Sequence, residues 1–525
     1  MRNLVMVALT VMLLAMSCPG EQLGYHAIQT DSAGKITPWF SPVAGEAYDH
    51  VIGVVWNFWK NLGNCSNGLP YFLQHQVWKP EHDPRGLGGD QLAMALSSLD
   101  LLYDYTGDPA AREMMVRIAD YCLERGFSGP QHAWPNLPYP YNTDLHSGRY
   151  DGDMRAGKGF LQPDKAGSLG IELLTLYEMT GNQRYLVAAT DIANTLAAKV
   201  APGDADHSPW PFRVNAQTGE TATKAFALYT ANWSGTLRLF SELSRLKRGN
   251  TAAYEKAYQL TSTWLKRFPL NSNKWGPFFE DVAEWSNTEI NADTLAWYIL
   301  ENPQWDRDWK ARSHGILDWS LATFGTNAWA NYGVTAIHEQ TAYRVPGNSH
   351  TSRHASVQLL YCEKTGDMSL KETAIRQLNW ATYMVDMDGK NRYPNDDIWL
   401  TDGYGDYLRH YLRAMAAMPE LAPSTQNHLL RSSSVIREIE YSSETIAYRT
   451  FDPISRERFR ISFRPSSVTL VGKRLRPVTA LHDLETQDGF YYEKAGAAKG
   501  LLEVKHSSTG PVVVHASSPD ARGSR

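Results

Sequence analysis

Thr106-Gly107-Asp108 decides the fold, because it recurs as Thr180-Gly181-Asn182 and Thr365-Gly366-Asp367, with a looser copy at Arg248-Gly249-Asn250. Each copy follows one helical pattern and precedes another. A glycine just past a helix end takes the left-handed conformation that caps the last carbonyls, and the Asp or Asn after it caps the amides of the next helix. The tripeptide therefore predicts a tight turn that sends one helix back along another.

The spacing of the copies predicts six helix pairs. The first three of these glycines lie roughly 70 residues apart. The interval from Gly249 to Gly366 is about two repeats long, as expected if one junction between them lacks the tripeptide. We place the missing junction at Asn302-Pro303, and an opening helix near Glu46 completes the set. Outer helices are expected near 46–62, 110–125, 183–198, 252–267, 308–323 and 368–384, and inner helices near 88–104, 164–180, 230–246, 288–300, 350–364 and 403–418.

The connections between these helices are unequal. Links from inner to outer helices are short, whereas links from outer to inner helices are long and rich in Trp, Tyr, His, Gly and Pro. The long links are 63–87, 126–163, 199–229, 268–287, 324–349 and 385–402. Loops of that length inside a compact domain are usually functional. All six would emerge on one face of a helical toroid, which we predict to be the working face.

The pattern changes after Pro419. Short alternating segments rich in Val, Ile, Tyr and Phe are separated by turn residues from 433 to 516, which predicts a small antiparallel β-domain, expected to be a sandwich. The predicted organisation is a signal peptide at 1–17, an N-terminal segment at 18–45, the toroid at 46–418, a linker at 419–432, the β-sandwich at 433–516 and a disordered tail at 517–525.

The first 17 residues predict a secretory signal peptide. Arg2 precedes an apolar run from Leu4 to Met16, and Ala15 and Ser17 supply small residues before Cys18. A buried N-terminal helix is the alternative. Cys18 stands directly after the predicted cleavage site, so a lipid anchor there is a second possibility. We therefore expect a secreted or periplasmic protein, and no later stretch is long and apolar enough to predict a membrane span.

Charge and motifs exclude several classes of function. The formal net charge is −5, which offers no basic stripe for nucleic acid. No nucleotide-binding loop, Cys-x-x-Cys site, His-Glu-x-x-His helix or Gly-x-Ser-x-Gly elbow occurs. His350 and His354 share one helical face and could bind a metal, but no third ligand is evident, so we expect no metal and no cofactor.

Carboxylates, histidines, arginines and aromatic residues in the long loops are the remaining candidates. We predict catalytic roles for Asp90, Asp164, Glu339 and Asp402, of which the first two open inner helices and could instead be simple helix caps. Flat rings stack on sugar faces, although many of the aromatic residues must form the core. The predicted substrate-binding residues are Trp134, Arg149, Tyr150, Trp233, His338, Tyr343, Asn348, His350, Arg353, Trp399 and Tyr404.

Six helix hairpins with Thr-Gly-Asp/Asn junctions, aromatic and acidic loops on one face, and a C-terminal β-domain resemble the six-hairpin (α/α)6-barrel carbohydrate-active enzymes. The resemblance covers roughly 46–418 and concerns organisation. Within that group it extends to uronate-directed glycoside hydrolases and polysaccharide lyases. It implies an oligo- or polysaccharide substrate in the toroid mouth, with Asp90 and Asp164 as the nearest counterparts of the catalytic carboxylates of the hydrolases.

Three functions remain open from the sequence. A glycoside hydrolase acting on uronic-acid-containing glycans would need a carboxylic acid to protonate the leaving oxygen and a carboxylate to activate water or attack the sugar. A polysaccharide lyase would instead remove a proton beside the uronate carboxylate, for which the candidates are Asn348, His350, Arg353, His338 and Tyr343. The guanidinium of Arg353 would suit a carboxylate in either reaction. A non-catalytic glycan-binding protein is the third possibility.

Overall fold

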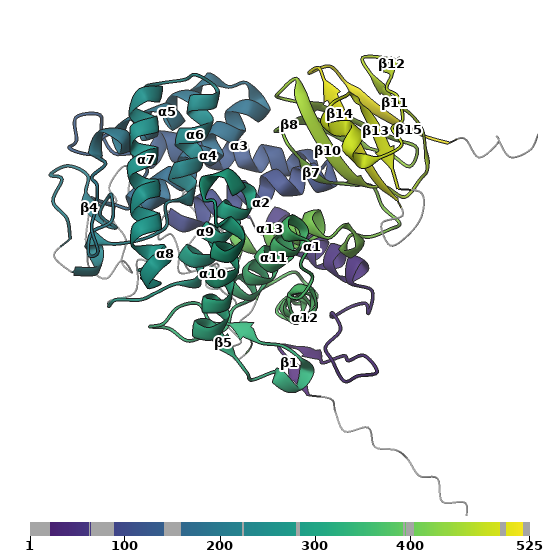
Figure 1. Cartoon of the computed structure of the whole chain (residues 1–525), viewed down its shortest axis with the longest axis horizontal. Helices are drawn as coiled ribbons and strands as arrows, with labels where there is room; N and C mark the ends of the chain where they lie inside the picture. Colours follow the sequence, from purple (N-terminus) through teal and green to yellow (C-terminus); the bar gives the residue numbers. More distant parts are fainter. Residues whose placement is uncertain are drawn as a thin grey trace, which may run out of the picture.

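The computed structural model describes residues 21–61, 63–64, 89–140, 159–222, 225–279, 284–391, 394, 404–493 and 500–517. Within these ranges the chain forms a barrel of paired helices followed by two packed β-sheets (Figure 1). The predicted signal peptide and Cys18 lie outside the described residues. No helix in the described ranges has the length and apolar character needed to cross a membrane.

An inner ring of helices encloses the barrel lumen. Each helix of the ring contacts the next, and the last closes on the first. In ring order these helices are α2 (Gly89–Thr106), α4 (Pro163–Thr180), α6 (Ser234–Arg245), α9 (Glu289–Glu301), α11 (Asn348–Thr365) and α13 (Tyr404–Ala417). Inner helices are covered on all sides, and every residue of α11 from Asn348 to Cys362 is buried.

An outer layer of helices covers the ring. Its members are α1 (Ala44–Asn61), α3 (Pro109–Arg125), α5 (Gln183–Lys199), α7 (Thr251–Arg267), α10 (Trp309–Phe324) and α12 (Lys371–Thr382), and a short α8 (Pro269–Ser272) follows α7. These helices are amphipathic, as in α1, where Val51, Val55 and Trp59 recur on one buried face. The predicted mainly α-helical (α/α)6 fold is confirmed, and the predicted helices match the observed ones within a few residues.

The repeated tripeptide forms the turns that the sequence predicts. Gly107, Gly181 and Gly366 have φ angles of 68°, 76° and 79°, in the left-handed region. The side chain of Asp108 accepts a hydrogen bond from the amide of Ala110 and so caps α3. The missing junction also lies where it was placed, because α9 ends at Glu301 and α10 begins at Trp309.

The β-domain consists of two antiparallel sheets with orders β13-β14-β10-β7 and β12-β11-β15-β9-β8. Their strands are β7 (His428–Ser432), β8 (Ile436–Tyr441), β9 (Thr445–Thr450), β10 (Ile454–Arg460), β11 (Pro465–Leu470), β12 (Lys473–Arg474), β13 (Gly489–Tyr492), β14 (Leu501–Ser507) and β15 (Val512–Ala516). The predicted linker at 419–432 is wrong for its last five residues, which form β7. Leu429 pairs there with Phe459 of β10 in a register shifted by a bulge, a long-range contact that no local pattern reveals.

The β-domain packs on the end of the barrel where the inner helices finish. His428 stacks on Tyr105 near the end of α2 with ring centroids 3.7 Å apart, and the Tyr441 hydroxyl donates to the carbonyl of Asp104. One continuous apolar core includes residues of both the barrel and the sheets. The opposite end of the barrel, where the inner helices begin, carries the long loops. The candidate functional site lies at this end.

Short two-stranded sheets lie in the N-terminal segment before α1 and in the described parts of these loops. They pair β1 (Gln22–Leu23) with β2 (His26–Ala27), β3 (Phe160–Leu161) with β4 (Val214–Asn215), and β5 (Gly325–Thr326) with β6 (Ala336–Ile337). The β3 strand leads directly into α4, and the segment after β6 leads into α11. The β3–β4 and β5–β6 pairs therefore fix the positions at which α4 and α11 begin.

Candidate functional site

The first turns of the inner helices converge at the loop end of the barrel. Each inner helix turns back through an outer one, so all six run in the same direction. Asp164 lies in the first turn of α4, Glu289 begins α9, and Asp406 lies in the first turn of α13. A carboxylate at a helix N-terminus is favoured by the helix dipole. The same geometry brings these acidic groups toward a common centre.

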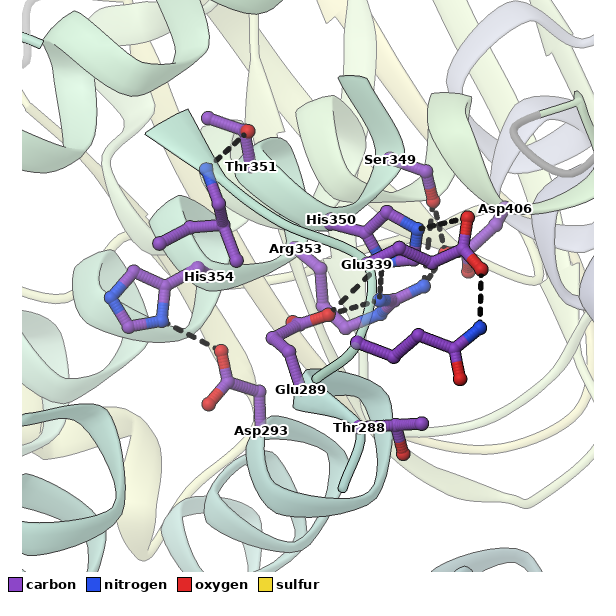
Figure 2. A network of polar contacts seen from close by, with 12 residues as sticks. Thr288, Glu289, Asp293, Glu339, Ser349, His350, Thr351, Arg353, His354 and Asp406 are labelled. Atoms are coloured by element: carbon purple, nitrogen blue, oxygen red, sulfur yellow. Dashed lines mark hydrogen bonds and ion pairs between the residues drawn. The ribbon is translucent and has the colours of Figure 1, made fainter. Parts of the chain in front are cut away.

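Arg353 is the centre of a buried ion-pair network between three inner helices. Its Nη1 donates to Glu289 Oε2 at 2.7 Å, and its Nη2 contacts Asp406 Oδ2 (Figure 2). The Arg353 side chain is 4% exposed, and both carboxylates are fully buried. Ser349 Oγ and His410 Nε2 also contact Asp406 Oδ2, the latter at 2.9 Å. Both terminal nitrogens of the guanidinium are thus engaged by the protein's own acids, whereas its Nε is buried and has no hydrogen-bond partner among the described residues.

His350 lies between two carboxylates. Its Nδ1 is 3.2 Å from Glu289 Oε2 and 3.4 Å from Arg353 Nη1, and its Nε2 is 4.0 Å from Glu339 Oε2 (Figure 2). The shorter contact of Nδ1 is the one to the carboxylate. A carboxylate next to one ring nitrogen favours the tautomer that carries the proton there. With the proton on Nδ1, the lone pair of Nε2 faces Glu339 across a gap longer than a hydrogen bond.

Burial determines the protonation of His350 and Glu289. It lowers the pKa of His350 well below the usual value, and the nearby charge of Arg353 acts in the same direction. His350 is therefore a neutral imidazole near neutral pH and can accept a proton. Burial also raises the pKa of Glu289 well above its usual value, while Arg353 opposes that rise.

His354 has a structural role. Its Nδ1 lies 2.7 Å from Asp293 Oδ2, and its Nε2 lies 3.1 Å from the amide nitrogen of Gln358, so both ring nitrogens are engaged inside the core. His350 and His354 thus face different partners. Among the described residues, no group of three or more His, Cys, Asp or Glu side chains is arranged to hold a metal ion.

Asp164 forms a second polar cluster at the same end of the barrel. Its Oδ2 accepts hydrogen bonds from Lys165 Nζ at 3.0 Å and from Asn232 Nδ2 at 2.8 Å. Its Oδ1 is buried and has no hydrogen-bond partner in the described part of the chain. Lys165 also donates to the carbonyl of Phe278 at 2.9 Å. Lys165 and Arg353 line one internal cavity, so the two clusters face a shared space.

Several predicted residues therefore lie close together. Glu339, His350 and Arg353 belong to one cluster, and Asn348 begins the same helix, with its Oδ1 accepting from the amide of Ser349 at 2.7 Å. Tyr343 is exposed in the loop before α11. His338 is half-buried at the start of that loop, and burial lowers its pKa, with Arg344 acting in the same direction.

Two predicted stacking residues are corrected. Trp233 is fully buried, donates its Nε1 proton to the carbonyl of Thr230, and packs on Trp210 with ring centroids 4.7 Å apart. Trp134 is 6% exposed and belongs to the apolar core. Neither ring offers a face to a sugar, because other side chains already cover it. Composition alone does not tell a core aromatic residue from a mouth aromatic residue.

The remaining predicted residues stay untested. Arg149, Tyr150, Trp399 and Asp402 lie outside the described residues. Asp90 and Tyr404 belong to the first turns of α2 and α13, but their side chains lie outside what is described.

The prediction did not include Glu289, Asp406 and His410 as site residues. A usable signal existed for the first two, because an acid in the first turn of an inner helix was the criterion that selected Asp90 and Asp164. No local pattern marks His410, whose role depends on its contact with Asp406.

Comparisons with known proteins agree with the fold. The sequence matches no protein-family profile and no curated protein. Among solved structures, the chain shares the (α/α)6 barrel of carbohydrate-active enzymes. It resembles a sugar epimerase from a ruminal bacterium at a TM-score of 0.53 and 11% identity, over 72% of this chain and 98% of that one.

Two further structures are similar. Cellobiose 2-epimerase from Bacillus thermoamylovorans has a TM-score of 0.52 and 16% identity over 70% of this chain and 97% of that one. D-mannose isomerase has a TM-score of 0.51 and 10% identity over 71% of this chain and 98% of that one. At such identities the likeness establishes the fold, and the chemistry has to be argued from this chain's own side chains.

Proposed function

We propose that this chain is a carbohydrate-active enzyme that moves a proton to or from a carbon atom of a sugar, with His350 as the acid–base group. The observation that carries the proposal is the position of His350, a buried imidazole with one nitrogen on Glu289 and the other facing Glu339. The barrel fold, which sugar epimerases and a sugar isomerase share, supports a saccharide substrate.

In this proposal His350 Nε2 removes a proton from a carbon next to a carbonyl or carboxylate group. The electrons of the broken C–H bond move into the neighbouring C=O group, and the imidazole becomes imidazolium. Glu289 holds Nδ1–H and stabilises that positive charge, as the orienting carboxylate does in a catalytic triad. A proton returned to the carbon gives an epimer or isomer, whereas loss of a neighbouring substituent gives elimination.

Glu339 is the second proton-handling group in this proposal. Its Oε2 faces the reactive nitrogen of His350 at 4.0 Å, and its Oε1 accepts from Gln340 Nε2 at 2.8 Å. A His–Glu pair on two sides of a substrate carbon or oxygen would allow one group to take a proton and the other to deliver one. Arg353 acts as a positioning residue, because its contacts go to Glu289 and Asp406.

Hydrolysis is the second candidate function. The observation in its favour is Asp164, a fully buried carboxylate whose Oδ1 lacks a described partner and whose ion-pair partner Lys165 lines the shared cavity. Paired with Glu339 or with Asp90, Asp164 would serve acid or base catalysis at a glycosidic bond. Action on uronic acids also remains a proposal, but Arg353 does not support it, because two carboxylates already occupy its guanidinium.

The test compares the wild type with His350→Asn and His314→Asn on a panel of neutral and uronate-containing saccharides. Asn places an amide donor near the position of Nδ1 and so keeps the contact to Glu289, while it removes Nε2. His314 is the matched control, since it pairs with Asp318 at 2.9 Å on the outer helix α10. We expect His350→Asn to lower kcat by about 10²–10⁴-fold and His314→Asn to leave it unchanged.

The products distinguish the two candidates. Epimerisation or isomerisation leaves the mass unchanged but changes the NMR spectrum, and elimination gives two products that add up to the substrate mass, one with an unsaturated end. Products that together are one water heavier, formed equally by His350→Asn and abolished by Asp164→Asn, would overturn the proton-transfer proposal in favour of hydrolysis.

We also propose export of the chain, with cleavage after Ser17. Mass measurement of the mature protein tests this: a chain that begins at Cys18 supports export, an added diacylglycerol mass at Cys18 supports the anchor, and an intact chain that begins at Met1 contradicts both.

A further inference from the structure

Exposed aromatic side chains are few in the described part of the chain, and they occur in two groups. Among the described residues, the exposed Phe, Tyr and Trp side chains are Tyr25, Phe40, Trp285 and Tyr343. The first two belong to the N-terminal segment, whereas Trp285 and Tyr343 lie in the loops before α9 and α11, at the end of the barrel that carries the candidate site. Single exposed apolar residues are normal on protein surfaces, so the grouping of the last two beside the site is the informative feature.

The loops that carry Trp285 and Tyr343 are hydrogen-bonded to each other. The amide of Ala342 donates to Ser286 Oγ at 3.2 Å, and the amide of Thr341 donates to the carbonyl of the residue after Ser286 at 3.0 Å. Each aromatic residue is the chain neighbour of one partner in the first of these hydrogen bonds. Because consecutive Cα atoms are about 3.8 Å apart, both aromatic residues belong to one small area of the barrel rim.

One hairpin carries both Tyr343 and Glu339. The amide of Glu339 donates to the carbonyl of Val345 at 3.0 Å. Tyr343 lies two residues nearer the tip of the hairpin than Val345, and its carbonyl accepts from the amide of Gln340 at 3.4 Å. An extended residue spans about 3.3 Å, so Tyr343 is about 7 Å along the hairpin from Glu339, which faces His350 at 4.0 Å. That step is of the order of one sugar residue.

Trp285 is packed on one side and bordered by polar groups. Its ring contacts Tyr229 with centroids 5.4 Å apart, and 39% of the Trp285 residue is exposed. Lys274 Nζ lies 5.2 Å from the centre of the Trp285 ring and 2.8 Å from Asp206 Oδ1. The Asp206 side chain is 79% exposed. A flat ring beside exposed hydrogen-bonding groups suits a sugar residue, whose C–H face stacks on the ring while its hydroxyls donate and accept hydrogen bonds.

We propose that Trp285 and Tyr343 form a sugar-binding strip on the barrel rim, here called the rim strip, and that the ligand is a saccharide chain rather than a free monosaccharide. The reactive sugar lies between His350 and Glu339, the next sugar packs on Tyr343, and a further sugar packs on Trp285 beside its neighbouring ion pair. This order of sugars rests on the proposed proton-transfer function, whereas the binding of a saccharide chain to the rim strip does not.

Affinity electrophoresis of the full chain measures this binding without turnover. Native gels contain hydroxyethylcellulose, galactomannan, xylan or polygalacturonate at increasing concentration, and the retardation of the protein gives a dissociation constant for each polymer. We expect at least one polymer to retard the wild type. Trp285→Ala should raise the dissociation constant of that polymer by about 10–30-fold, and Tyr343→Ala by about 3–10-fold, because buried aromatic anchors dominate binding energies.

Two control variants separate sugar binding from folding and from simple exposure. Trp285→Phe keeps a ring against Tyr229, so its dissociation constant should stay within about threefold of the wild-type value. Phe40→Ala is the matched control, because Phe40 is 55% exposed but stacks on His50 of the outer helix α1, and it should leave the retardation unchanged. Equal mobility of every variant in polymer-free gels establishes that each one folds.

Each outcome decides the proposal. A dissociation constant that rises in Trp285→Ala but not in Phe40→Ala supports the rim strip. Retardation by none of the four polymers, or equal retardation of the wild type and Trp285→Ala, would overturn it. The comparison with His350→Asn tests proton transfer separately. Retardation that depends on Trp285 would therefore stand if proton transfer failed, and proton transfer would stand if no polymer retarded the chain.

Discussion

Replacing Arg353 by Met is the most informative perturbation of the barrel. The guanidinium joins Glu289 of α9 to Asp406 of α13, and its side chain is 4% exposed. Met has a similar length and leaves the packing largely filled, but it removes the guanidinium from two fully buried carboxylates, of which Asp406 keeps Arg409 and His410 and Glu289 keeps only His350 among the described basic partners. Breaking a buried ion pair by removing one partner costs about 3–5 kcal/mol, because the remaining charge has no compensation.

The expected change in Tm follows from the size of the chain. An unfolding entropy of about 2.1 cal/mol/K per residue gives about 1.1 kcal/mol/K for 525 residues. A loss of about 3–5 kcal/mol therefore lowers Tm by about 3–5 °C at pH 7.5. The loss should shrink at pH 5. The pKa of Glu289 is already raised by burial, and removing Arg353 raises it further. The penalty exists above the pKa of the unfolded carboxyl group and fades as the pH falls toward it.

Calorimetry of Arg353→Met and Arg184→Met at both pH values is the assay. Arg184 is the matched control, because it also lies near two carboxylates, Asp120 at 3.5 Å and Glu124 at 3.9 Å, but on the surface of α5. Its loss should cost at most about 1 kcal/mol. Adding Glu289→Gln to Arg353→Met should restore more than half of the lost stability, since it removes the charge that loses its only cationic partner among the described residues, while Asp406 keeps Arg409. Equal losses for the two arginine variants would refute the reasoning.

Two further predictions concern packing and pH. Gly167→Ala should cost about 1–3 kcal/mol of unfolding free energy, because its Cβ would lie 1.9 Å from Thr236 Oγ1 where α4 contacts α6. Gly53→Ala in α1 has no atom within 4 Å of the new Cβ and should stabilise the helix by up to about 1 kcal/mol. Urea unfolding that ranks the two variants the other way would contradict this. Burial and Glu172 raise the pKa of Asp100 to about 7, so the folded state keeps a proton that the unfolded state loses. The stability that this proton contributes declines as the pH rises from about 4 and is gone above about 7. Asp100→Asn should therefore gain Tm relative to the wild type between pH 5 and pH 8, and parallel Tm curves would exclude this role.

The helical architecture could be predicted because its signals are local. Gly181 and Asn182 act on their own helix ends, so the turn is encoded within three residues. Short alternating segments likewise predicted most of the β-domain. The strand at 428–432 was missed because its pairing with β10 is made across the chain.

The candidate site could be predicted only in part. His350, Arg353 and Glu339 were selected because they lie in or beside one loop, and they do lie together. Glu289 and Asp406 carry the same first-turn signal as Asp90 and Asp164 but were not selected, and their contact with Arg353, each from a helix more than fifty residues away in sequence, could not be predicted. Which helix faces meet inside a barrel depends on helix register, which one sequence does not reveal. For the same reason Trp233 was assigned to the mouth although it faces the core.

The central claim is that His350 carries protons to and from a carbon atom of a sugar. The most direct measurement is NMR of the saccharide panel after incubation with the wild type in D₂O. The account predicts one deuterium in a non-exchangeable carbon-bound position, at a carbon next to a carbonyl or carboxylate group, and its loss in His350→Asn but not in His314→Asn. An epimerised, isomerised or hydrolysed product with no deuterium on carbon, in the absence of any unsaturated product, would contradict it.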